Sequence, residues 1–120
     1  MKNTIEDMQR LKKEFRSCQK TLIALGDETR QYLLQIMLGG TCSGSRVVDI
    51  AKKTNLSRPA VSHHMQILKS AGIVKSRKEG TFVFYYLDPQ DSEMEKMITL
   101  FQDIKRIKAN VPDRSKDDEI

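Results

Sequence analysis

Long apolar runs and a cysteine framework are both missing from this sequence. No segment approaches the roughly 18 consecutive apolar residues that a membrane-spanning helix needs, so we expect no membrane partner. The first stretch, MKNTIEDMQRLKKEF, lacks the apolar core of a signal peptide, which predicts a cytoplasmic protein. The two cysteines, Cys18 and Cys42, are too few for a disulfide framework, and a reducing compartment would keep them as thiols.

The chain is also too short for a two-domain enzyme. Its 120 residues, 38% of them hydrophobic, can bury one modest core. The adjacent Ser62, His63 and His64 could suggest catalysis, but no cleft-forming elements accompany them. The nearest acid in sequence is Asp49, in the preceding predicted helix. We therefore expect a single domain over residues 1–111 that is not an enzyme.

Acidic residues are absent from one long stretch, residues 52–78. The whole chain has 21 Lys and Arg against 16 Asp and Glu, for a net charge of +5. Seven of the basic residues lie in the acid-free stretch, so the remainder, with fourteen basic and sixteen acidic residues, is slightly negative. Solvated helix faces usually mix the two signs because like charges repel. A long segment of one sign therefore indicates binding to a polyanion such as nucleic acid.

The centre of this stretch predicts a helix with one buried and one exposed face. Ser57 is a good N-cap for the backbone N–H of Ala60, and Pro59 suits the first turn. Gly72 can end the helix. Apolar residues at steps of four and three form the buried face: Val61, Met65, Leu68 and Ala71. The opposite face carries Pro59, Ser62, His63, Gln66 and Ser70 and is available to contact another molecule.

A shorter helix and a hairpin flank this element. The shorter helix precedes it, with a buried stripe made of Val47, Val48, Ile50 and Ala51. A turn of about four residues joins the two, which predicts a helix-turn-helix over residues 45–72. Downstream, strands are expected at residues 73–76 and 81–87, with the turn at Glu79 and Gly80. We expect this hairpin, residues 73–87, to be a wing with Arg77 and Lys78 near its tip.

The two ends of the chain predict helices with similar apolar seams. The first helix, over about residues 4–25, has seam residues separated by three or four positions: Met8, Leu11, Phe15, Cys18, Leu22 and Leu25. The second, over about residues 92–111, has Met94, Met97, Phe101, Ile104 and a final Ile107 or Val111. Such seams pack either on the chain's own core or on a second subunit, and we expect a homodimer formed by these terminal helices. The polar tail at residues 112–120 is expected to be disordered.

The segments LGDETRQYLLQIML and NLSRPAVSHHMQILKSAGIVKSRKEGTFVFYYL resemble the ArsR (ArsR/SmtB) family of winged helix-turn-helix transcriptional regulators. The resemblance covers about residues 22–87. It implies a mainly α winged helix-turn-helix with five or six helices and a two-stranded β-hairpin wing. It also implies a homodimeric repressor that releases its operator when an inducer, often a metal ion, binds. The turn containing Asp27, Thr29 and Arg30 matches a recurring structural signature of the family.

The metal sites of the family are not matched by this sequence. Many relatives have a Cys-x-Cys pair in the helix before the recognition helix, where Arg46 and Val48 stand here. Others use Asp and His on the last helix, which here has Glu93, Glu95 and Asp103 but no histidine. Because carboxylates alone bind first-row transition metals poorly, we expect no metal site and no cofactor.

The two cysteines give a different hypothesis for the inducer. Some relatives respond to sulfide or oxidants through two cysteines, so Cys18 and Cys42 are the candidates for a thiol-based redox switch. Alternatively, Cys18 is a small buried residue of the seam and Cys42 an incidental loop residue. The sequence leaves the effector unidentified.

We predict that the protein binds double-stranded DNA sequence-specifically and represses transcription. The residues expected at base edges are Arg58, Ser62, His63 and Gln66, because Arg and Gln pair bidentately with G and A. Those expected to hold phosphates are Ser57, Lys69, Arg77, Lys78 and Thr81. The alternative is a winged helix that docks a partner protein, which a mixed-charge or aromatic recognition face would favour.

Overall fold

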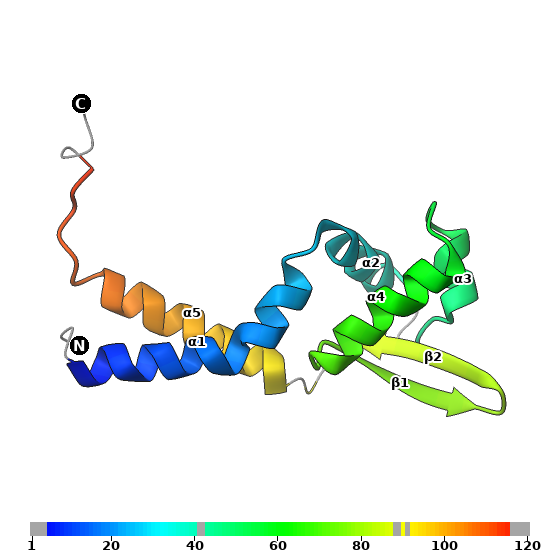
Figure 1. Ribbon diagram of the computed structural model, residues 1–120, viewed down its shortest axis with the longest axis horizontal. Coiled ribbons are helices and arrows are strands. Elements are labelled where there is room, and N and C mark those ends of the chain that lie inside the picture. Colours follow the sequence, from blue (N-terminus) through cyan, green and yellow to red (C-terminus); the bar gives the residue numbers. More distant parts are fainter. Residues whose placement is uncertain (1–4, 41–42, 88–89, 91, 116–120) are drawn as a thin grey trace. The chain divides into compact units, whose positions relative to one another are not determined.

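The computed structural model describes residues 5–40, 43–87, 90 and 92–115. Within these ranges the elements follow in the order α1 (Ile5–Leu25), α2 (Glu28–Leu38), α3 (Val47–Lys52), α4 (Arg58–Ser70), β1 (Val74–Glu79), β2 (Phe82–Leu87) and α5 (Ser92–Lys108), as Figure 1 shows. Five helices and one antiparallel hairpin confirm the predicted mainly α winged helix-turn-helix class. None of the described helices is both long and apolar enough to cross a membrane.

The chain divides into two compact units, one made of residues 19–94 and the other of residues 1–18 with 95–120. The single domain expected over residues 1–111 stays a prediction. In the first unit, the buried core takes Leu33 from α2, Ile50 from α3 and Tyr85 from β2. The predicted buried face of α4 is confirmed, since these four residues are all buried: Val61, Met65, Leu68 and Ala71.

The corner between α1 and α2 is held by the N-cap residue of α2 and by an arginine in its first turn. Asp27 caps α2 as predicted, with its Oδ1 accepting hydrogen bonds from the backbone N–H groups of Thr29 (3.0 Å) and Arg30 (3.2 Å). The last turn of α1 has no basic residue of its own. Arg30 serves it instead, because its Nε donates to the carbonyl of Ala24 at 2.7 Å and its Nη2 to that of Ile23 at 3.4 Å. These carbonyls belong to the final turn of α1, where helical partners run out.

The hairpin is longer on its first strand than the sequence predicts. β1 continues to Glu79, which pairs with Phe82, so Arg77 and Lys78 lie inside the strand, near the tip of the hairpin as predicted. The turn is made by Gly80 and Thr81 instead of the predicted Glu79 and Gly80. Gly80 has φ 60°, and in the described chain only glycines have positive φ, so φ of Thr81 is negative. A positive φ at the first turn residue and a negative φ at the second are what a two-residue type II′ turn requires. Charged residues are poor strand formers alone, and here pairing with the apolar β2 extends the strand.

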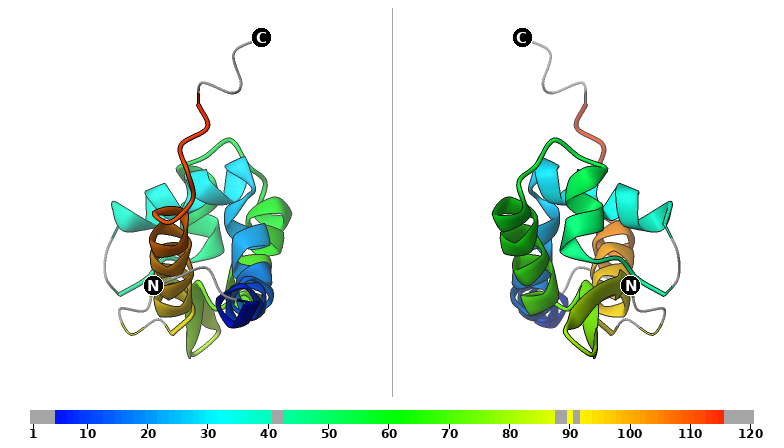
Figure 2. Two further views of the ribbon diagram at one scale, coloured as in Figure 1. Left: turned by 90° about the vertical axis from the view of Figure 1, so that its left-hand side faces the viewer. Right: turned by 90° about the vertical axis from the view of Figure 1, so that its right-hand side faces the viewer.

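The second unit pairs α1 up to Cys18 with α5 from Glu95 onward. The two helix segments lie side by side in Figures 1 and 2. The side chains buried in this unit are Asp7, Cys18, Met97, Leu100, Asp103 and Ile107. Several predicted seam residues are not buried, among them Phe15 and Phe101, which are 45% and 52% exposed.

The end of the chain differs from its predicted boundaries. α5 ends at Lys108, three positions before the expected end of the last helix. Residues 112–115 are exposed and lie outside the helix. The rest of the tail expected to be disordered, residues 116–120, lies outside the described residues.

Replacing Arg30 by Ala should lower the free energy of unfolding by about 2 kcal/mol, because buried carbonyls of α1 lose their charged donor. Urea unfolding followed by circular dichroism measures this change. Arg16 is the matched control, since it is exposed and its Nε lies 3.5 Å from the carbonyl of Lys12. Arg16→Ala should change the free energy by less than about 0.5 kcal/mol. Equal effects of the two substitutions would contradict the role given to Arg30.

Candidate nucleic-acid interface

The turn between α3 and α4 is fixed by short-range hydrogen bonds. Thr54 Oγ1 donates to the carbonyl of Ala51 at 3.3 Å and accepts from the backbone N–H of Leu56 at 3.2 Å. Ser57 Oγ accepts the backbone N–H of Ala60 at 3.2 Å, which confirms the predicted N-cap of α4. These bonds give the turn and the first residues of α4 a defined local conformation.

The solvent face of α4 is basic and polar. Arg58, His63, Gln66 and Lys69 are exposed, and Ser62 is half-buried. No acidic residue lies on this helix. The face therefore presents hydrogen-bond donors and positive charge together.

An open groove of about 700 Å³ lies between α4, the hairpin and the start of α3. It contains six of the nine residues predicted to contact DNA: Ser62, Gln66, Lys69, Arg77, Lys78 and Thr81. The other three, Ser57, Arg58 and His63, do not line the groove and lie at or near the N-terminal half of α4. Their contacts with DNA stay predictions. The described lining of the groove has no Asp or Glu.

Arg77 and Lys78 differ in what they can offer, although the sequence assigned both to phosphates. Both residues line the groove, but as neighbours in β1 their side chains leave the strand in alternating directions. The Arg77 guanidinium lies 4.7 Å from the centre of the Phe84 ring, and its Nε donates to Glu79 Oε1 at 3.2 Å. Its Nη1 donates to the carbonyl of Ser43. Arg77 is thus held by its own hairpin and by the segment before α3, whereas Lys78 is exposed.

Gln66 is oriented by the wing. Its Nε2 donates a hydrogen bond of 2.9 Å to the hydroxyl of Tyr85, a residue that is itself buried. The amide keeps a carbonyl oxygen and a second N–H, which are the groups that pair with an adenine edge. The contact therefore restrains Gln66 without using up its recognition groups.

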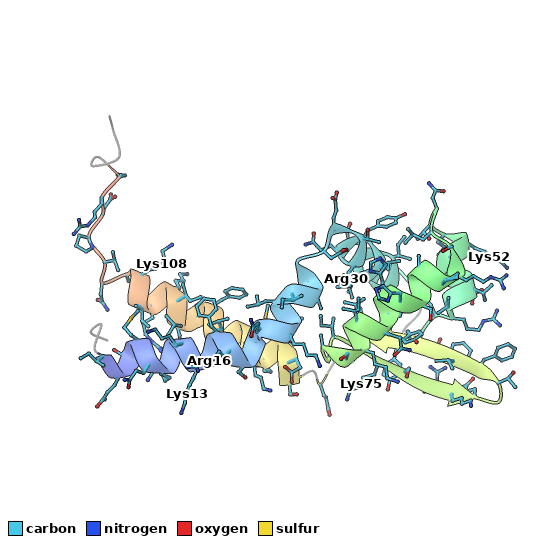
Figure 3. The ribbon with its side chains drawn as sticks, viewed as in Figure 1. Lys13, Arg16, Arg30, Lys52, Lys75 and Lys108 are labelled. Atoms are coloured by element: carbon cyan, nitrogen blue, oxygen red, sulfur yellow. The ribbon has the colours of Figure 1, made fainter. Side chains whose placement is uncertain are left out.

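His64 lies apart from the recognition face, and its position distinguishes it from His63. Its Nδ1 is 3.3 Å from Nη1 of Arg30. Because a guanidinium has no acceptor, Nδ1 accepts this hydrogen bond. Figure 3 shows the Arg30 side chain between α2 and α4. His64 is therefore a structural residue that ties α4 to α2.

Arg46 is a residue of the groove that sequence reasoning missed. Its guanidinium lies 4.8 Å from the centre of the Phe82 ring, and its Nε donates to Asp49 Oδ2 at 3.0 Å. This hydrogen bond is the main cause that lowers the pKa of Asp49 below its ordinary value. The i, i+3 spacing of Arg46 and Asp49 was the only signal in the sequence. Contact with Phe82 depends on the fold of the hairpin.

Of the candidate redox pair, one thiol lies in the described part of the chain. Cys18 is buried on α1, and Cys42 lies outside the described residues. The switch formed by these two thiols therefore stays a prediction. Among the described residues, no group of three His, Cys, Asp or Glu side chains could hold a metal ion.

Comparison with known proteins identifies the family. The profile described as "Bacterial regulatory protein, arsR family" matches residues 27–76. An uncharacterised HTH-type transcriptional regulator of Methanocaldococcus jannaschii is 43% identical over 77 residues, which cover 62% of this chain and 83% of that protein. The transcriptional repressor SdpR of Bacillus subtilis is 37% identical over 65 residues, covering 54% of this chain and 69% of SdpR.

A solved structure agrees with this assignment. Reduced HlyU from Vibrio cholerae superposes with a TM-score of 0.60 at 29% identity, covering 80% of this chain and 96% of that one. The chain belongs to the ArsR family of winged helix-turn-helix regulators. It is a DNA-binding transcriptional regulator, and the alternative of a winged helix that serves only to dock a protein is set aside.

The ion pair beside the groove can be tested by titration. Because the pKa of Asp49 is lowered in the folded protein, the pair contributes stability above the ordinary Asp pKa of about 3.9, and this contribution is lost as the pH falls through the lowered pKa. Arg46→Ala should raise the pKa of Asp49 back toward its ordinary value, as measured by carboxyl ¹³C NMR. Asp27 is the control, because its pKa is lowered mainly by a hydrogen bond from the backbone N–H of Arg30. The titration of Asp27 should therefore be the same in the wild type and in Arg46→Ala. An unchanged Asp49 titration in the variant would contradict the pair in solution.

Proposed function

We propose that this protein represses transcription by binding a specific operator in double-stranded DNA as a homodimer, and that an inducer releases it. The observation that carries this proposal is the groove in which the exposed face of α4 meets the hairpin, lined by basic and polar residues. The name of SdpR, a repressor, supports the sign of the regulation.

In the proposed complex, α4 enters the major groove, which is wide enough for one helix. The residues proposed to contact base edges are Arg58, Ser62, His63 and Gln66. Gln66 is the best prepared of them, because its hydrogen bond to Tyr85 restricts the side chain before DNA arrives. A restricted side chain loses less entropy on binding.

The residues proposed to hold phosphates are Ser57, Lys69, Arg77, Lys78 and Thr81. Ser57 already accepts a backbone N–H, so only its hydroxyl hydrogen is offered to a phosphate. Arg77 is restrained by Phe84 and Glu79. Lys69, Lys78 and Thr81 are exposed, and Lys78 carries its charge on the hairpin.

The proposed dimer uses the apolar side chains that the unit of α1 and α5 leaves uncovered. On α1, Met8 and Phe15 are exposed, and on α5, Ile98 and Phe101 are exposed. Exposed apolar side chains gathered on one pair of helices are typical of an association surface. A second copy of the chain is the proposed occupant, because two linked recognition helices are needed to read two half-sites about one helical turn apart.

Binding should depend steeply on salt and on two different kinds of side chain. If a dimer makes six to ten phosphate contacts, affinity should fall roughly 10³- to 10⁵-fold between about 50 and 200 mM salt. Gln66→Ala should cost about 1–3 kcal/mol of discrimination for a duplex selected from a random pool, whereas Lys78→Ala should weaken all duplexes alike. Fluorescence anisotropy with the selected and an unrelated duplex measures both effects.

Lys12, exposed on α1, provides the control for charge alone, and Lys12→Ala should leave both affinities nearly unchanged. Binding that ignores salt would refute a phosphate-based interface. The same loss from Gln66→Ala on both duplexes would show that Gln66 does not contribute to recognition.

Placing a charge in the exposed seam should separate the subunits. Phe101→Glu should give a monomer at micromolar concentration and lose binding to the selected duplex, because a carboxylate would be buried without a partner. Sedimentation velocity measures the first effect and anisotropy the second. Gln102→Glu adds the same charge one position along α5 and should remain dimeric. A folded wild-type monomer at micromolar concentration would rule out the dimer.

A further inference from the structure

We propose that Arg46 is an additional contact to the DNA backbone and that Asp49 and Phe82 position it. This inference rests on the proposed binding of DNA in the groove, and it adds a residue outside the predicted set. Asp49 acts through Arg46 and is a positioning residue.

The backbone brings Arg46 to the wing. Ser45 and Tyr85 exchange two hydrogen bonds, N–H to carbonyl in both directions, each 2.9 Å long. Arg46 follows at once in an extended conformation, with φ −83° and ψ 154°, and its side chain makes no capping bond to α3. The side chain is therefore available to reach the Phe82 ring at the start of β2.

Two sides of the guanidinium are occupied and one edge is not. The guanidinium carbon lies over the Phe82 ring, and Nε donates to Asp49 Oδ2, with a second bond of 3.4 Å from Nη2 to Oδ1. Arg has five N–H donors, and these bonds use two of them. Within the described chain no hydrogen bond occupies Nη1, and Arg46 lines the groove. An unoccupied guanidinium edge in a basic groove suits a phosphate oxygen.

The fold itself gains little from this arrangement. The side chains of Arg46 and Asp49 are 34% and 40% exposed, and exposed ion pairs contribute little to stability. Phe82 is 52% exposed, so its ring is only partly covered. The two contacts restrict the Arg46 side chain before DNA binds. The side chain therefore loses less rotamer freedom on binding. Restriction of this kind favours binding more than folding.

Substitution of Asp49 distinguishes a positioning role for this residue from an effect of charge alone. A carboxylate close to the interface repels phosphates, so on charge alone Asp49→Asn should raise DNA affinity. If Asp49 positions Arg46, the same substitution should lower affinity despite the loss of a negative charge. The two accounts predict opposite signs for one variant.

The test measures anisotropy of the full chain with a duplex selected from a random pool and with an unrelated duplex of equal length. Arg46→Ala should weaken both duplexes roughly tenfold and reduce the salt slope by about one per protomer. Asp49→Asn should weaken both in the wild-type background and should cause no loss in the Arg46→Ala background. Arg46→Lys keeps the charge but loses the fork, and it should retain the salt slope with reduced affinity. Circular dichroism of each variant verifies folding.

Unchanged affinity in Arg46→Ala, or increased affinity in Asp49→Asn, would overturn the inference. Its failure is distinguishable from failure of the proposed function. If the wild type binds and Lys78→Ala weakens binding while Arg46→Ala does not, only the role of Arg46 falls. If the wild type binds neither duplex, the proposed function falls with it.

Discussion

The two backbone hydrogen bonds between Ser45 and Tyr85 are the constraint on which the interface depends. They join the segment before α3 to the second strand of the wing, so the helix-turn-helix and the hairpin meet at a fixed point. Close to that point, the Tyr85 hydroxyl accepts a hydrogen bond from Gln66 on α4. The Arg46 guanidinium lies over the ring of Phe82, next to the turn of the hairpin. A strand pair alone is marginal in water, and here packing of Tyr85 in the core supports it. Backbone pairing therefore brings the two sides of the groove together. It also sets the positions of the side chains that line the groove.

Charge and packing are divided between the two faces of α4. The buried face carries the apolar residues that hold the helix to the core, and the basic groups lie on the other face and on the hairpin. Basic residues concentrated on one surface repel one another, and Asp49 beside Arg46 and Glu79 beside Arg77 reduce this repulsion only slightly because both pairs are exposed. Phosphates would relieve the remaining repulsion.

Local signals made α4 and its cap predictable, because the hydroxyl of Ser57 and the spacing of Val61, Met65 and Leu68 are properties of neighbouring residues. The sequence predicted a hairpin but not its register or the length of its first strand. The length of β1 depends on pairing with β2, which is not a local property of the sequence. Arg30 and Arg46 could not be assigned from sequence. The first reaches carbonyls of another helix, and the second stacks on a ring thirty-six positions away. Such contacts exist only after the chain has folded. The family resemblance therefore pointed to Arg30 as part of a recurring turn, but the sequence did not show which carbonyls it would bind.

The central claim is that DNA occupies the groove between α4 and the hairpin. Mapping amide chemical shifts by ¹H–¹⁵N NMR while a duplex is added tests it most directly. The account predicts that the largest changes fall on the solvent face of α4, on the hairpin and at Arg46, with small changes along the exposed side of α2. Largest changes on α2, with α4 and the hairpin unaffected, would contradict it.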